Sequence, residues 1–377
     1  MATAHKKILL IFSVVVLGTA LLFAAGLALL YHQKVDLRAL AHTLLPPAAK
    51  AEHFPDWQQT PILTRIRFAV NYEISHKGES IYARYLGSVT PAAMLDFVEL
   101  RHPFCHSEAH DLGVAIMAQT QDVVKAMDTC DTRCTNGCMH GVLGQVFAQA
   151  PNAEGSSDGT DPALSPDSLC TKVMVTQRHK PGNCAHAIGH ALMKLHATKP
   201  ERALTDCAKF TDRSMEYYCA TGVYMGYEEQ WDSRAAHHTA APFPCTADTK
   251  FPAACYRYFL RHFTEDDKPS DEQLLAHCLS LPDRRQMGCF HGLGRYFQST
   301  VAKTPSALHR VCEKGSDADR VLCIEGAIEK LSDYDPALAE RACRSIGMKD
   351  QEICLAAAHG GMYRLTKSTM TYYLVDR

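Results

Sequence analysis

The sequence predicts an all-α fold in which disulfide-stapled α/α hairpins repeat as a solenoid or closed toroid, carried on a single N-terminal transmembrane helix. Three observations predict this fold. Residues 8–31 carry no charge, all 16 cysteines of the 377-residue chain follow that segment, and from Cys170 onward the cysteines come in pairs. The second members of these pairs recur about every 34 residues, which is the length of a helix–turn–helix unit.

The charge balance limits the classes of partner. The chain has 39 Lys and Arg against 41 Asp and Glu, a formal net charge of −2. Domains that bind nucleic acid through bulk charge carry a clear basic excess, so we expect no nucleic-acid partner. The hydrophobic fraction of 46% is that of a globular chain, and it excludes wholesale disorder.

The first predicted element is a membrane-spanning helix at residues 8–31. At about 1.5 Å per residue it covers a bilayer core of about 30 Å, whereas a cleavable signal peptide has an apolar region of about 7–15 residues. An uncut signal peptide is the alternative. Lys6 and Lys7 precede the span and favour a cytoplasmic N-terminus. The predicted order is a cytoplasmic segment (1–7), the signal anchor (8–31), a juxtamembrane linker (32–60) and an extracytoplasmic cysteine-rich α-helical repeat domain (61–377).

The cysteines indicate the compartment. An even number of them beyond the span is typical of disulfides in an oxidising environment. The expected location is therefore a bacterial inner membrane, single-pass, with the C-terminal domain in the periplasm. The expected partners are the membrane, through residues 8–31, and another membrane or periplasmic protein.

Each later cysteine pair marks one predicted hairpin of helix A, a short loop and helix B. The first cysteine ends helix A and the second begins helix B, so the two lie side by side in an antiparallel pair, within reach of a disulfide. Thr304-Pro305 and Asp335-Pro336 are typical helix starts, and residues 283–286 exemplify the charged loop. The period and hairpin form resemble, as a class, the cysteine-stapled relatives of tetratricopeptide and Sel1-like repeats.

The spacing predicts eight disulfides. Among the four earliest cysteines, the hairpin pattern predicts a bond between Cys130 and Cys138, and by elimination Cys105 bonds to Cys134. The alternative is that these cysteines form a redox-active or metal-binding group. The six later predicted bonds join Cys170 to Cys184, Cys207 to Cys219, Cys245 to Cys255, Cys278 to Cys289, Cys312 to Cys323 and Cys343 to Cys354.

Histidines gather near the start of helix B. Two pairs stand four residues apart, so each pair lies on one helix face and can share a metal ion. The first five predicted ligands come from three consecutive hairpins, and the last two are expected to face them across a cavity. The predicted metal ligands are His106, His110, His140, His186, His190, His291 and His359.

Equivalent positions in stacked hairpins lie on one surface, so the residues two places after each second cysteine form a predicted row. That row reads His140, His186, Thr221, Arg257, His291, Glu325 and Ala356. Glycines recur beside it at positions 141, 189, 222, 292 and 326. Because glycine costs about 1 kcal/mol within a helix, its recurrence predicts tight helix–helix contact or a ligand close to the backbone.

These residues predict a membrane-anchored extracytoplasmic metal-binding protein, with a metalloenzyme as one interpretation of its multi-histidine site. Imidazole ligands suit Cu, Zn or Fe. Glu108, Asp111 and Glu325 are candidates to orient a ligand or to act as a general base. One alternative is that the histidines are core residues bonded to the backbone of the next hairpin. The other is a non-catalytic interaction scaffold or assembly factor that uses the concave face of the repeats.

Overall fold

The computed structural model describes residues 24–26, 28, 36–44, 54–74, 81–102, 105–149, 165–174, 180–196, 199–230, 245, 249–266, 269–361 and 363. These residues form helices and turns without a β-strand, so the predicted all-α class is confirmed for them. The chain divides after Phe104 into two compact units, whereas the expected cysteine-rich domain begins at residue 61.

The predicted membrane span lies outside the described residues, apart from residues 24–26 and 28. Within the part of the chain that is described, no helix has both the length and the apolar character needed to cross a bilayer.

The first unit is a small helical unit with an aromatic core. Trp57, Phe68 and Phe97 are fully buried, with ring centroids 5.9 Å apart for Trp57 and Phe68 and 5.0 Å apart for Trp57 and Phe97. The buried carboxylate of Asp96 accepts a hydrogen bond from the backbone N–H of Trp57 at 2.8 Å. Its helices are α2 (Leu37–Leu44), α4 (Pro55–Gln59), α5 (Ile62–Ile74), α6 (Ile81–Tyr85) and α7 (Pro91–Arg101).

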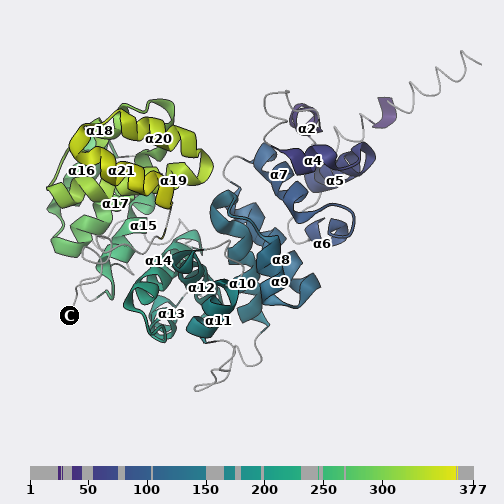
Figure 1. Cartoon of the computed structure of the whole chain (residues 1–377), viewed down its shortest axis with the longest axis horizontal. Helices are drawn as coiled ribbons and strands as arrows, with labels where there is room; N and C mark the ends of the chain where they lie inside the picture. The colour runs from purple at the N-terminus through teal and green to yellow at the C-terminus, as the bar shows by residue number, and fades with distance from the viewer. Residues whose placement is uncertain are drawn as a thin grey trace, which may run out of the picture. The chain divides into compact units, whose positions relative to one another are not determined.

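The second unit consists mostly of short helices that each precede a longer one (Figure 1). The long helices α8, α10, α12, α14, α15, α17, α19 and α21 each contact the next one in this order. The helices are α8 (His106–Thr120), α9 (Val123–Thr129), the 3₁₀ turn η1 (Cys134–Asn136), α10 (Gly137–Ala148), α11 (Pro166–Met174), α12 (Pro181–Leu195), α13 (Pro200–Cys207), α14 (Arg213–Gln230), α15 (Pro252–Asp266), α16 (Asp271–Ser280), α17 (Asp283–Lys303), α18 (Ala307–Cys312), α19 (Asp317–Tyr334), α20 (Pro336–Arg344) and α21 (Met348–Gly360).

Eight disulfides join these helices, and they are the pairs that the spacing predicts. In α11 and α12, for example, Cys170 near the end of the short helix bonds to Cys184 near the start of the long one. The Cα atoms of the bonded cysteines lie between 5.0 and 5.7 Å apart. The five bonds that follow along the chain join Cys207 to Cys219, Cys245 to Cys255, Cys278 to Cys289, Cys312 to Cys323 and Cys343 to Cys354.

The first two disulfides involve the four earliest cysteines. Cys105 bonds to Cys134, and Cys130 bonds to Cys138, as the hairpin logic predicts. All sixteen cysteines of the chain are therefore oxidised. No free thiol is left to bind a metal ion.

Two local predictions about helix boundaries are wrong. Helix α17 ends before Thr304, because a residue that precedes a proline is disfavoured in the helical conformation. Pro305 then lies in a turn, and α18 starts at Ala307. Residues 283–286 form the first turn of α17 rather than a loop, and the carboxylate of Asp283 is favourable at that helix N-terminus. The start at Asp335-Pro336 is confirmed, since the Asp335 carboxylate accepts from the N–H of Leu338 at 2.8 Å.

Consecutive long helices cross at paired glycines. A Cβ added to Gly189 of α12 would overlap the Cys219 carbonyl, and one added to Gly222 of α14 would overlap the His186 carbonyl. The same reciprocal arrangement joins α8 to α10 and α17 to α19. Tight helix contact therefore explains these glycines, and it brings the residues beside them on neighbouring helices close together.

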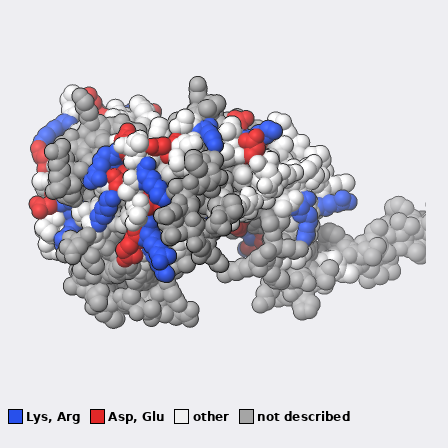
Figure 2. Space-filling view, turned by 90° about the horizontal axis from the view of Figure 1, so that it is seen from below, with Lys and Arg blue, Asp and Glu red and all other residues white. Residues whose placement is uncertain are grey.

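Surface charges on the second unit are neutralised locally. Arg320 lies 2.8 Å from Asp317 and 2.9 Å from Asp350, and Lys349 lies 2.9 Å from Asp317. On the face shown in Figure 2, the described basic and acidic side chains are interspersed. This distribution fits the net charge of −2.

Candidate metal centre

Five of the seven predicted ligands lie together in the second unit. His106 and His110 stand one turn apart in α8, His140 lies near the start of α10, and His186 and His190 lie in α12. The ring centroid of His140 is 4.8 Å from that of His106 and 5.2 Å from those of His186 and His190. We call these five residues the histidine cluster.

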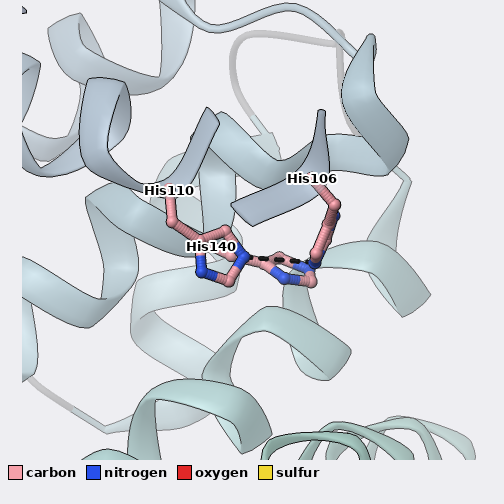
Figure 3. Close-up of side chains that lie close together, drawn as sticks. All are labelled: His106, His110 and His140. Carbon is pink, nitrogen blue, oxygen red and sulfur yellow. Dashed lines mark hydrogen bonds between the residues drawn. The ribbon is translucent and has the colours of Figure 1, made fainter. Parts of the chain in front are cut away.

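Three members of the cluster could hold one metal ion, namely His106, His110 and His140 (Figure 3). One nitrogen from each lies within 4.8 Å of the others, and the Nε2 atoms of His106 and His110 are 3.1 Å apart. Imidazoles bound at about 2.1 Å to one ion place their nitrogens about 3 to 3.4 Å apart and their ring centres about 5 Å apart. The triad is therefore close to a binding geometry before any ion is bound.

Contacts at Nδ1 fix the orientation of the His106 ring. Its Nδ1 lies 3.0 Å from the carbonyl oxygen of Cys134 and 2.7 Å from the hydroxyl of Thr135. A carbonyl can only accept, so this contact assigns the proton to Nδ1 and leaves a lone pair on Nε2. A hydrogen bond from the second ring nitrogen to a carbonyl is the usual way in which proteins orient a metal-binding histidine.

The turn that supplies these two partners is strained. Cys134, Thr135 and Asn136 all have left-handed φ angles, of 52°, 51° and 62°. A branched residue such as threonine rarely adopts that conformation, and each such residue costs of order 1–3 kcal/mol. Disulfides from Cys134 to Cys105 and from Cys130 to Cys138 hold the turn in place. Strained residues of this kind are common at functional sites, and here the strained turn carries the two partners of His106.

His140 lies at the centre of the cluster without a conventional partner. Its side chain is buried, with 4% exposure, and neither ring nitrogen has a hydrogen-bond partner among the described residues. Leaving a buried polar group unbonded costs about 1–3 kcal/mol. The core-histidine alternative requires a bond to the backbone of a neighbouring hairpin. His106 makes such a bond, but His140 does not.

Burial keeps the cluster in the form that binds metals. It lowers the pKa of His110, His140 and His186 well below the ordinary histidine value, and neighbouring histidines lower it further. These three side chains are therefore neutral at physiological pH. Neutral imidazole is the ligand form, and an ion bound by the triad would displace the proton that His110 Nε2 donates to His106 Nε2.

His186 is held by a second set of partners. Its Nδ1 lies 2.8 Å from the hydroxyl of Thr221, and its Nε2 lies 2.9 Å from the hydroxyl of Tyr363 and 3.3 Å from the sulfur of Met225. The ring of Tyr363 stacks on the imidazole with centroids 4.0 Å apart. His186 thus faces both His140 and a group of residues outside the triad.

The structure does not bring the last two predicted ligands to the cluster. His291 is buried, and its Nε2 lies 3.3 Å from the Glu329 carboxylate, which also pairs with Arg257 at 3.3 Å. The His359 side chain is 66% exposed and lies 3.2 Å from Glu340. It stands five residues after its cysteine, which turns it away from the row.

The three candidate carboxylates lie in two helices. Glu108 is half-buried and Asp111 is exposed, both in α8, whereas Glu325 is buried in α19.

Sequence reasoning missed several residues that complete the surroundings of the cluster. Positions six after the second cysteine lie one turn beyond the row and face the same way. Besides the predicted ligand His190, they include Met225, Arg295 and Glu329, which were not predicted. Extending the row by four residues would have found them. Thr135 and Tyr363 carry no such signal, because a strained turn and the C-terminal segment place them.

No protein-family model, curated protein or solved structure matches this chain. A functional assignment therefore rests on the residues themselves.

Proposed function

We propose that the protein binds one transition-metal ion through His106, His110 and His140, on the outer side of a membrane. The observation that carries this proposal is the triad itself. Two Nε2 atoms lie 3.1 Å apart, and a third, buried imidazole beside them has no hydrogen-bond partner among the described residues. The oriented Nδ1–H of His106 and the neutral state of the other two rings support it.

His190 is the proposed fourth ligand. Its ring centroid lies 5.2 Å from those of His110 and His140, the separation expected for imidazoles on a common ion. A site of nitrogen ligands alone suits Zn, Cu or Fe. Ligation by only the three triad imidazoles would leave a position for an exogenous ligand, as in catalytic rather than structural zinc sites, and this supports the metalloenzyme interpretation.

The proposed setting is a periplasmic domain on a membrane anchor at residues 8–31. Eight disulfides suit an oxidising, extracytoplasmic compartment. We also propose that the hairpins stack into a closed form rather than an open solenoid. Contact between α19 and η1, and the hydrogen bond between Tyr363 and His186, support closure because they join segments far apart in the chain.

The test is metal content in the full-length protein, purified in detergent with its disulfides oxidised. The protein is stripped with a chelator, dialysed against Zn²⁺, Cu²⁺ or Fe²⁺ in turn, and analysed by elemental mass spectrometry. We expect one tightly held ion per chain. His106→Ala/His140→Ala should lose it, whereas His359→Ala, which removes an exposed histidine, should retain it.

Four outcomes would count against this function. Wild-type protein that holds no ion, or a folded double variant that holds as much as the wild type, would refute the triad. A double variant that unfolds while the wild type carries no metal would favour the core-histidine alternative. A metal-free, folded protein that co-purifies stoichiometrically with a membrane or periplasmic protein would favour the scaffold.

A further inference from the structure

A second set of donor atoms converges beside the triad. His186 Nε2 in α12 faces Met225 Sδ in α14 at 3.3 Å and the Tyr363 hydroxyl at 2.9 Å. His186 is fully buried and Met225 is half-buried, so solvent reaches this pair of donor atoms more easily from the side of the Met225 sulfur. The reciprocal glycines Gly189 and Gly222 bring α12 and α14 close enough for this contact.

The hydrogen bonds of Thr221 determine which nitrogen of His186 carries the proton. The Thr221 hydroxyl donates its single proton to the carbonyl of Tyr218 at 2.6 Å. Its contact with His186 Nδ1 at 2.8 Å must therefore be one in which Nδ1–H donates. Nε2 then carries a lone pair, so no hydrogen lies between this nitrogen and the Met225 sulfur.

Two lone-pair donors facing each other at this distance fit an ion better than they fit packing. Ligand atoms about 2.0–2.3 Å from one ion lie about 3 to 3.5 Å apart, which includes the observed 3.3 Å. The Met225 sulfur lies at this distance from Nε2, the ring atom that carries the lone pair.

We propose that His186 Nε2 and Met225 Sδ bind a soft monovalent ion, such as Cu(I), in a second site next to the histidine triad. Thioether and neutral imidazole are ligands that such an ion accepts. A single positive charge also suits this position, because Arg257 and Arg295 act on His186 through their charges. Glu329 offsets part of that charge through its ion pair with Arg257. The second site uses donor atoms outside the triad and does not require the triad to be filled.

Tyr363 is a cap on this site in the empty protein. Its hydroxyl donates to His186 Nε2, the atom that the ion would take. The hydroxyl of Tyr258 lies 3.0 Å away and can accept the proton instead. Binding therefore breaks the bond to His186 and reverses the direction of the Tyr258–Tyr363 bond, so that each of the two buried hydroxyls keeps one hydrogen bond.

The experiment uses Ag⁺ as the probe, because Ag⁺ has the charge and soft-ligand preference of Cu(I) but is neither oxidised by air nor subject to disproportionation in water. Full-length protein in detergent, in chloride-free nitrate buffer, is first saturated with Zn²⁺ and then titrated with Ag⁺. We expect one Ag⁺ per chain. Met225→Leu should weaken this binding at least tenfold, whereas Met193→Leu, a buried methionine of α12, should leave it unchanged.

Methyl NMR on ¹³C-methionine protein provides a readout that needs no folded variant. Of the 13 methionines, the Met225 methyl should be the one that Ag⁺ shifts most. No Ag⁺ binding by Zn-saturated wild type, unchanged binding by folded Met225→Leu, or a shift confined to other methionines would overturn the second site. If Zn²⁺ fails to bind while Ag⁺ binds through Met225, the triad proposal fails and the second site stands. His106→Ala/His110→Ala should lose Zn²⁺ and keep Ag⁺.

Discussion

Replacing Gly141 with alanine tests how the helices hold the triad together. The added Cβ would overlap the carbonyl of His110 in α8, which is backbone and cannot swing aside. Overpacking of this kind costs about 1–3 kcal/mol, and the rigid neighbour places it at the upper end. The gain in helix propensity returns about 1 kcal/mol. We therefore expect the free energy of unfolding to fall by about 1–2 kcal/mol.

Gly144→Ala is the matched control, one turn further along α10. A Cβ there meets nothing within 4 Å, so this variant should gain about 0.5–1 kcal/mol. Both are measured by denaturant unfolding with the disulfides intact, together with Zn²⁺ affinity. Gly141→Ala should also weaken Zn²⁺ binding, because α10 carries His140 away from His110. Equal stability and equal affinity of the two variants would refute the assignment of Gly141 to a tight crossing that sets the triad.

Three further predictions concern the surroundings of the cluster. Glu329→Leu should destabilise the protein by about 3–5 kcal/mol in denaturant unfolding, since Arg257 would stay buried without its partner. The double variant Arg257→Met/Glu329→Leu should recover most of the loss, and a single variant within about 1 kcal/mol of wild type would contradict this reasoning. Thr135→Val keeps the shape but removes the hydroxyl beside His106, so Zn²⁺ should bind about tenfold more weakly in a competition assay, and unchanged affinity would count against that role. Burial, aided by Arg257, lowers the pKa of His291 to about 3 from its ordinary value of 6.5. The neutral form is thus favoured by folding, and its contribution is complete above about pH 6.5 and lost as the pH falls toward about 3, by up to about 1.4 kcal/mol per pH unit. His291→Phe should flatten the acid side of a stability–pH curve, and a curve of unchanged slope would be the contrary result.

The spacing of the cysteines along the chain predicted much of the second unit. A disulfide requires two cysteines whose Cα atoms can approach to about 5.5–6 Å, and the end of one helix and the start of the next satisfy this in any antiparallel hairpin. Seven of the eight bonds follow from that local rule, and the bond between Cys105 and Cys134 follows by elimination. The meeting of His106, His140 and His186 was also predictable, because adjacent hairpins place equivalent positions side by side.

The remaining parts of the site depend on longer-range geometry. His291 stands at the same position in its hairpin as His186, but it pairs with Glu329 because α17 packs on α19. Tyr363 reaches His186 from 177 residues away. Of the three consecutive left-handed residues at the Thr135 turn, none is glycine and only Asn136 is of a type that favours this conformation. These placements depend on how helices cross, on where the C-terminal segment packs and on local backbone strain. No short sequence pattern predicts any of these three features.

The most direct test of the central claim is X-ray absorption spectroscopy of the protein loaded with a single Zn²⁺ per chain. Coordination by His106, His110 and His140 predicts a first shell of nitrogen at about 2.0–2.1 Å, with the outer-shell scattering of at least three imidazole rings. His140→Ala should reduce that imidazole count. A first shell dominated by oxygen, or an identical spectrum from folded His140→Ala, would contradict a metal centre at this triad.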